Sequence, residues 1–364
     1  MVRKENLLPW EVSMKLRGID FGPCLDAAGV RGFFGEGYWF HSLFRLIFWG
    51  FSFAGSTFVA KTTTLYARTA PPNGNMRIRA HRPFWPVERF PRCIWWDWLT
   101  GRTLNAVGLA GPGAQKLFAS GLLVRAAYEP FMISFMAVGK TVEDRIKEFR
   151  GFVSLLRAQL VGTSARFLKL GLQINVSCPN TGLDTSELVH EARAMLDIAQ
   201  ELEMPIVVKI NLLARVEDAK AIADHPACDA LCFTNSIPFG TLPRVIQWDA
   251  VFPNGSPLEN RDASFGKGGY SGEDLLMPLA SFSRNLRNAG VVKPFNVGGG
   301  IRKPQNIDYL VNVGLLRRGH DSIFFSSAAM VRPWRLRGII RRAHERLGTI
   351  VLEPAEERAK PIEA

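Results

Sequence analysis

The chain has 364 residues, and its 47% hydrophobic and 21% charged composition is ordinary for a globular protein with a sizeable core. Five cysteines without paired spacing argue against a disulfide framework and against a zinc or iron–sulfur site, so we expect a reducing compartment and no metal. A net charge of +12 suits an acidic partner or an anionic substrate, but no nucleic-acid-binding signature accompanies it, and we expect no nucleic acid.

The longest apolar stretch and the first residues point to a cytoplasmic protein. Residues 1–6 are charged, but the apolar segment of a signal peptide does not follow them. Residues 43–60 contain Arg45, Gly50 and Gly55, so they divide into a buried helix and a following strand more naturally than they form a membrane span. We therefore expect no transmembrane segment.

From about residue 20, segments typical of strands and helices alternate along the chain. Strands are expected near residues 22–28, 57–63, 131–136, 168–175, 205–210, 229–234, 292–297 and 321–326. Between the third and the fourth, Thr141 and Asp144 form the pattern of a capping box, and apolar residues then recur at helical spacing. Eight strand–helix units predict an α/β fold of the (β/α)8 TIM-barrel type. A doubly wound open sheet is the alternative, but no Gly-x-Gly-x-x-Gly follows the first strand.

We expect one barrel domain over residues 1–350, with two insertions on its C-terminal face. The first insertion, 66–104, is rich in arginine, proline and aromatic residues. The second, 236–271, is polar and punctuated by glycine, proline and asparagine. Residues 351–364 are charged, and we expect a flexible tail there.

Reactive side chains follow several of the predicted strands. The segment Asn175-Val-Ser-Cys-Pro-Asn180 places two amides, a hydroxyl and a thiol directly after a strand. Amides can hold a planar polar ligand, and a thiol can move a proton once its pKa is tuned. A turn around a buried cysteine is the alternative interpretation of Cys178 alone. Functional groups at the other strand ends weaken that alternative: Lys61, Lys209, Asn235, 298–300 and 326–327.

Taken together, these motifs resemble dihydroorotate dehydrogenase, an FMN-dependent (β/α)8-barrel enzyme of pyrimidine biosynthesis. The resemblance runs in unbroken order over roughly residues 14–345. It rests on the motif at 175–180, on Lys-Thr-Thr-Thr-Leu at 61–65, on Asn-Ala-Val-Gly-Leu at 105–109, on Gly-Gly-Tyr-Ser-Gly at 268–272 and on the glycine and serine loops near the C-terminus.

The resemblance implies oxidation of dihydroorotate to orotate. Cys178 would be the base that removes the C5 proton, while a hydride passes from C6 to flavin N5. A cysteine in this position marks the soluble class of the family, whereas the quinone-reducing membrane class uses serine. Lys61 would be the second catalytic residue. The substrate-binding residues implied are Lys61, Asn105, Asn175, Asn180, Asn235 and Ser236.

The same resemblance implies FMN as the cofactor. Lys209 would stabilise the negative charge of reduced FMN, and the phosphate would lie after strands seven and eight, where barrels commonly bind it. The cofactor-binding residues implied are Ala28, Gly29, Lys61, Thr62, Asn175, Lys209, Thr234, Gly272, Gly299, Gly300, Ser326 and Ser327.

The long first insertion, 66–104, and the aromatic segment 38–53 depart from the family pattern. Residues 77–98 pair five arginines with four tryptophans, three of them in the run 95–98, which suits a membrane interface or a docking surface. We expect peripheral attachment to a membrane or an acidic partner; a lid packed on the barrel is the alternative. We also expect a homodimer, while the electron acceptor (fumarate, NAD through a partner subunit, or quinone) stays open.

Three other functions remain as alternatives. The protein could be an FMN enzyme for another dihydropyrimidine or an unrelated enone, a barrel that has lost its activity, or a binding protein that uses its basic surface. A yellow flavin colour would separate the enzymes from the binding protein.

Overall fold

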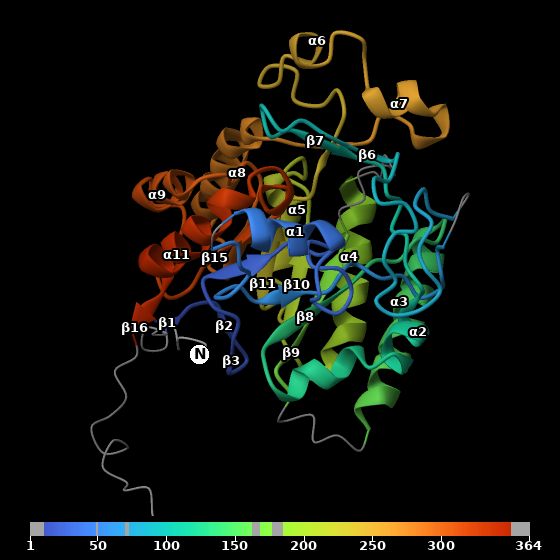
Figure 1. Ribbon diagram of the computed structural model, residues 1–364. Coiled ribbons are helices and arrows are strands. Elements are labelled where there is room, and N and C mark those ends of the chain that lie inside the picture. Colours follow the sequence, from blue (N-terminus) through green and yellow to red (C-terminus); the bar gives the residue numbers. More distant parts are fainter. Residues whose placement is uncertain (1–10, 49, 70–72, 162–167, 177–184, 351–364) are drawn as a thin grey trace, which may run out of the picture.

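A parallel eight-stranded barrel forms the centre of the molecule (Figure 1). The computed structural model describes residues 11–48, 50–69, 73–161, 168–176 and 185–350. A single parallel bridge between Leu25 and Thr57 joins the two strands that lie at the edges of this sheet, so the barrel is nearly closed. The strands confirm all eight predicted segments and the TIM-barrel prediction. Their order around the barrel is β4 (Cys24–Asp26), β15 (Ser322–Phe325), β14 (Phe295–Val297), β11 (Ala230–Phe233), β10 (Ile206–Lys209), β9 (Leu170–Asn175), β8 (Phe131–Phe135) and β5 (Phe58–Val59).

Helices lie between consecutive barrel strands and cover the outside of the barrel. The predicted helix start at Thr141 is confirmed, because its hydroxyl accepts a hydrogen bond from the Asp144 N–H at 3.1 Å. The α-helices are α1 (Trp39–Ile47), α2 (Ala114–Ala119), α3 (Val142–Leu160), α4 (Thr185–Ala199), α5 (Val216–Ala223), α6 (Trp248–Val251), α7 (Pro257–Arg261), α8 (Leu276–Asn288), α9 (Pro304–Asn312), α10 (Ala328–Val331) and α11 (Leu336–Leu347). Short 3-10 turns are η1 (Leu122–Ala127), η3 (Gln200–Leu202), η4 (Ala263–Phe265), η5 (Glu273–Leu275) and η6 (Pro333–Arg335).

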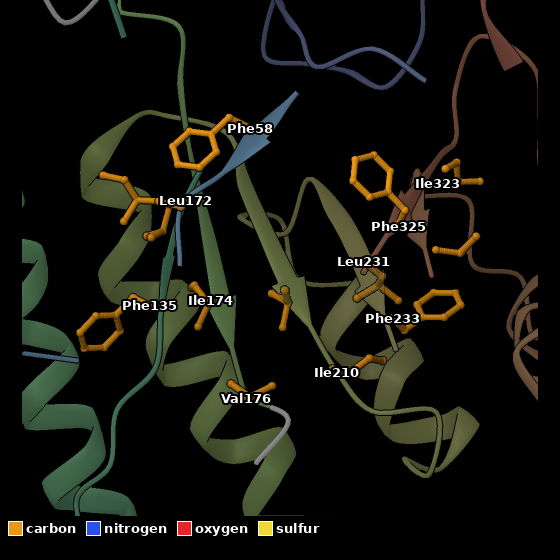
Figure 2. Close-up of a cluster of buried hydrophobic side chains, with 14 of the residues drawn as sticks. Phe58, Phe135, Leu172, Ile174, Val176, Ile210, Leu231, Phe233, Ile323 and Phe325 are labelled. Atoms are coloured by element: carbon orange, nitrogen blue, oxygen red, sulfur yellow. The ribbon is translucent and has the colours of Figure 1, made fainter. Parts of the chain in front are cut away.

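The period-two alternation of the strands divides the hydrophobic core into two layers. Outward-facing residues such as Phe135, Leu172 and Phe233 pack against the helices (Figure 2). Inward-facing residues form a second cluster inside the barrel, and the N-terminal hairpin of β2 (Lys15–Leu16) and β3 (Ile19–Asp20) contributes to it. Burying each large apolar side chain stabilises the fold by about 1.5–3 kcal/mol.

The two insertions pair with each other in one four-stranded antiparallel sheet. Its order is β12 (Ile237–Pro238), β13 (Gly269–Ser271), β7 (Thr103–Asn105) and β6 (Ile94–Trp96). Figure 1 shows β6 and β7 above the barrel, with α6 and α7 beyond them. The insertions therefore lie over the carboxyl ends of the strands, as predicted.

Two further features concern the ends of the described chain and the membrane. Near the N-terminus, β1 (Glu11–Val12) pairs antiparallel with β16 (Thr349–Ile350). Within the described ranges, no helix combines the length and the apolarity needed to cross a bilayer.

Candidate functional site

The inward side of the barrel becomes polar at the carboxyl ends of the strands. Asn175 and Lys209 are the last residues of β9 and β10, and they are register partners. Lys209 is also paired with Cys232 on β11. Because apolar residues such as Leu172 and Val208 face the helices in these strands, alternation turns Asn175 and Lys209 toward the inside of the barrel.

These strand ends line a cavity of about 760 Å³. The cavity brings together most of the site residues predicted from the sequence. Among the residues that line it are Ala28, Gly29, Lys61, Thr62, Asn105, Asn175, Lys209, Thr234, Asn235, Ser236, Gly299, Gly300, Ser326 and Ser327.

Three predicted site residues are not placed in this lining. Cys178 and Asn180 lie outside the described residues, and their roles stay predictions. Gly272 does not line the cavity, although its neighbour Ser271 does. A Cβ at Gly272 would lie 2.2 Å from the Tyr270 hydroxyl, so packing against Tyr270 is a sufficient reason for glycine at this position.

A chain of hydroxyl and amide groups forms part of the cavity floor. Thr62 lies 2.9 Å from the hydroxyl of Ser134, which donates to the Gln173 side chain at 3.1 Å. Ser134 and Gln173 are fully buried, and Thr62 reaches the cavity. These bonds satisfy polar groups that would otherwise be costly to bury, and they hold the Thr62 hydroxyl in place.

Lys61 lies at the cavity wall beside the loop after β4. Its ammonium nitrogen donates to the Ala110 carbonyl at 2.6 Å and lies 5.2 Å from the centre of the Phe33 ring. Burial lowers the pKa of Lys61 to about 8. The group therefore loses its charge as the pH rises through about 8, and an anion beside it would favour the charged form.

Lys209 is a buried cation elsewhere on the cavity wall. Its side chain is 5% exposed, and the ammonium nitrogen lies 5.6 Å from the centre of the Phe324 ring. Burial lowers its pKa. In the described part of the chain no carboxylate lies within salt-bridge distance of Lys209, so a negatively charged ligand would stabilise it.

The amides come from two separate parts of the fold. Asn105 ends β7 of the inserted sheet and lies opposite Gly269 of β13. Asn235 follows β11, and its side-chain oxygen accepts from the N–H of Ser236 at 3.1 Å. The neighbouring Thr234 hydroxyl accepts from the Leu212 N–H at 3.0 Å, which fixes the chain after β11. The inserted sheet and the barrel thus face the same cavity with amide groups.

The glycine loop after β14 has no room for side chains. Gly300 has a φ of +76°, and a Cβ there would lie 2.6 Å from the Leu276 nitrogen at the start of α8. At Gly299 a Cβ would lie 2.8 Å from the Thr234 methyl group. The loop therefore presents its bare backbone to the cavity, near Ser326 and Ser327 after β15. Backbone N–H groups and hydroxyls of this kind suit an anion such as phosphate.

The chain is distantly similar to dihydroorotate dehydrogenases. It is 29% identical over 143 residues to the catalytic subunit of dihydroorotate dehydrogenase B (NAD(+)) of Geobacillus sp. (strain WCH70). This match covers 38% of this chain and 42% of that protein. It is 27% identical over 185 residues to dihydroorotate dehydrogenase A (fumarate) of Lactobacillus helveticus (strain DPC 4571). This second match covers 49% of this chain and 50% of that protein. The match thus spans half or less of each curated relative, and no protein-family model matches the chain. These relatives confirm the resemblance to dihydroorotate dehydrogenase that the motifs indicate.

The sequence patterns did not predict several of the residues that line the cavity. The described lining contains seven basic side chains but only two acidic ones, Glu88 and Glu191, and Glu191 pairs with Arg145 at 2.8 Å. The basic residues are Lys61, Arg68, Arg79, Arg89, Arg145, Lys209 and Arg302. Arg302 had a detectable signal, since it lies two residues after Gly300. The arginines of the first insertion stood out as a cluster, but the sequence does not show that Arg68, Arg79 and Arg89 are the ones that line the cavity.

The tryptophan-rich part of the first insertion packs partly on the protein itself. The Trp95 ring lies 5.2 Å from the Phe252 ring of the second insertion, and Trp98 lies 6.0 Å from Phe44 of α1. Trp96 lines the cavity. These contacts agree with the lid interpretation for the hairpin, while Trp98 stays 43% exposed.

Proposed function

We propose that the protein is an FMN-dependent oxidoreductase that converts dihydroorotate to orotate. One observation carries the proposal: three amides, the buried Lys209, the partly buried Lys61 and a bare glycine loop converge on a single cavity at the carboxyl ends of the barrel strands. The amides match the carbonyl and N–H groups of a pyrimidine ring, and the lysines match anionic groups on the substrate and the cofactor.

The residues present fit FMN. Lys209 is a buried cation without a carboxylate partner in the described chain, which suits the N1/O2 edge of a flavin that becomes negative on reduction. Gly299, Gly300, Ser326 and Ser327 offer donors to a phosphate. When bound, FMN would supply the acceptor for the hydride.

The substrate would lie between the amides of the barrel and Asn105 of the inserted sheet. Lys61, whose pKa of about 8 leaves it charged at neutral pH, would bind the carboxylate of dihydroorotate. Cys178 would accept the proton that leaves C5 of the substrate. The oxidant stays open, because the two relatives are named for different oxidants, NAD(+) and fumarate.

Anaerobic titration tests this function. The purified protein should show flavin absorbance, and dihydroorotate should bleach it without oxygen. Dihydrouracil is the matched control, because it has the same ring without the carboxylate. Bleaching by dihydrouracil but not by dihydroorotate would favour the alternative of another dihydropyrimidine. A colourless protein that takes up no FMN would contradict the proposal as a whole.

We also propose that α1 attaches the protein peripherally to an anionic membrane. Leu43, Leu46 and Ile47 of α1 are 42%, 84% and 59% exposed, and Leu99 and Trp334 are exposed as well. Aromatic contacts join α1 to the segments that carry these residues: the Phe44 ring contacts the Trp98 ring, and the centre of the Phe48 ring lies 5.6 Å from the centre of the Trp334 ring. We call Leu43, Leu46, Ile47, Trp98, Leu99 and Trp334 the α1 patch. The net charge of +12 complements anionic lipid. The expected homodimer stays a prediction.

A further inference from the structure

Arg302 is a buried arginine at the end of the cavity where the glycine and serine loops meet. It follows Gly299 and Gly300 in the loop after β14, lines the cavity and is only 2% exposed. Its guanidinium donates to the Ser327 hydroxyl at 3.4 Å and to the Thr100 carbonyl at 3.2 Å. Both partners are neutral, so neither compensates the positive charge.

The nearby carboxylates are already paired with other cations. Glu273 pairs with Lys303 at 2.9 Å, and Asp274 pairs with Arg102 at 3.2 Å. Across the described ranges, no carboxylate lies within salt-bridge distance of Arg302. Burial lowers the pKa of Arg302 to about 10, which reflects the cost of holding this charge away from water. Glu273 and Asp274 attract this charge without forming an ion pair with it, so an anion bound at this end of the cavity would stabilise the buried guanidinium further.

A second arginine holds the tip of the β6–β7 hairpin over the same place. Arg332 donates to the carbonyls of Trp98 and Leu99, while Arg302 holds Thr100. The next residue, Gly101, has a φ of +73°, and a Cβ there would overlap the Arg302 guanidinium. The hairpin tip 97–101 therefore covers Arg302, which explains why this charge is shielded from solvent.

We propose that Arg302 binds the phosphate of the flavin mononucleotide and makes the cavity selective for the phosphorylated flavin over uncharged riboflavin. The inference rests on the proposed flavin function and adds to it a specific residue. A planar guanidinium can donate two parallel hydrogen bonds to phosphate oxygens and also carries a positive charge. Backbone N–H groups and serine hydroxyls donate hydrogen bonds but carry no charge. The dianion would in turn compensate the buried charge.

The test compares the affinities of FMN and riboflavin, measured by quenching of flavin fluorescence on the flavin-free full-length protein. Wild type should bind FMN more tightly than riboflavin. Arg302→Gln should weaken FMN binding by about 10- to 100-fold, the usual worth of a charged hydrogen bond, and should leave riboflavin affinity within about twofold. Arg302→Lys, which keeps the charge but loses the fork, should lie between the two. Arg284→Gln is the matched control, because it removes an exposed arginine charge of α8 outside the cavity lining, and its FMN to riboflavin ratio should equal that of wild type.

The outcomes separate this inference from the proposed function. If wild type binds neither flavin, the proposed function fails and the inference fails with it. If wild type binds FMN but Arg302→Gln keeps the wild-type ratio, the inference alone is overturned. Riboflavin binding by Arg302→Gln shows that the variant is folded. If that variant does not fold, an unchanged ratio in Arg302→Lys overturns the inference, and a lowered ratio supports it.

Discussion

Lys209 and Asn175 are register partners at the ends of β10 and β9, so a buried ammonium group and an amide start from neighbouring positions on the inner wall of the barrel. Both residues are 5% exposed. This pairing places the charge expected to stabilise a reduced cofactor directly beside an amide expected to contact the substrate.

Lys209→Met should slow flavin reduction by dihydroorotate by about 10²–10³-fold, because the negative charge that develops on the flavin loses its compensating cation. Rapid mixing without oxygen measures the rate. Lys220→Met is the control, since Lys220 lies on α5 and pairs with Asp224 at the surface. A wild-type rate in the Lys209 variant would remove this residue from the chemistry.

Cys178→Ala should retain flavin and bind orotate while flavin reduction slows by about 10²–10⁴-fold, the usual contribution of a positioned base. Cys178→Ser should be slow at neutral pH and recover as the pH rises. The measurement is single-turnover flavin reduction over a pH series. Reduction that is equally fast in Cys178→Ala and wild type would exclude Cys178 as the base.

Lys61 should produce a falling limb in the pH profile near pH 8. Its pKa is lowered by burial to about 8, so the ammonium group loses its proton as the pH rises through that value and the dihydroorotate carboxylate loses its partner. We expect kcat/KM to fall above about pH 8 in wild type. In Lys61→Arg the limb should move to higher pH, because arginine stays protonated. The same limb in both proteins would assign it to another group.

Arg31→Met should lower the free energy of unfolding by about 3–5 kcal/mol, because it leaves the carboxylate of Asp26 buried without its partner. Arg31 contacts Asp26 through two hydrogen bonds of 2.8 Å, and Asp26 is 1% exposed. Urea unfolding measures the loss. Arg17→Met removes the more exposed pair with Asp229 and should cost less than about 1 kcal/mol. Equal losses in the two variants would contradict the role given to burial.

The double variant Leu46→Ser/Ile47→Ser should reduce co-sedimentation with vesicles of anionic lipid, because it removes the two most exposed aliphatic side chains of α1 in the α1 patch. Val161→Ser/Val292→Ser is the control, since these exposed valines lie near the amino ends of β9 and β14, away from the hairpin. Equal recovery of wild type and the α1 variant in the supernatant would leave the lid interpretation standing alone.

The sequence predicted the barrel well because each strand carries its own local pattern. Alternating or β-branched segments end at or next to Asn175, Lys209 and Thr234. The sequence pattern therefore placed these residues at the carboxyl ends of the barrel strands. The pairing of β13 with β7 could not be predicted, because residues 105 and 269 are far apart and neither segment specifies its partner. The helix expected to be buried near residue 43 exposes Leu46 and Ile47, since its periodicity does not show which face meets the barrel. Gly272 followed from the motif, yet its close contact with Tyr270, two residues earlier, depends on the conformation of the chain after β13.

The shared sheet of the two insertions constrains how this protein can diverge. Because β13 lies between β12 and β7, a deletion in residues 236–271 that removes β13 would expose one backbone edge of β7, the strand that carries Asn105, and would leave it paired with β6 alone. A change in the length of one insertion therefore has to be matched in the other. Grafting either segment onto another barrel would require moving both together. Among related proteins, we expect changes in the lengths of the two segments to occur together.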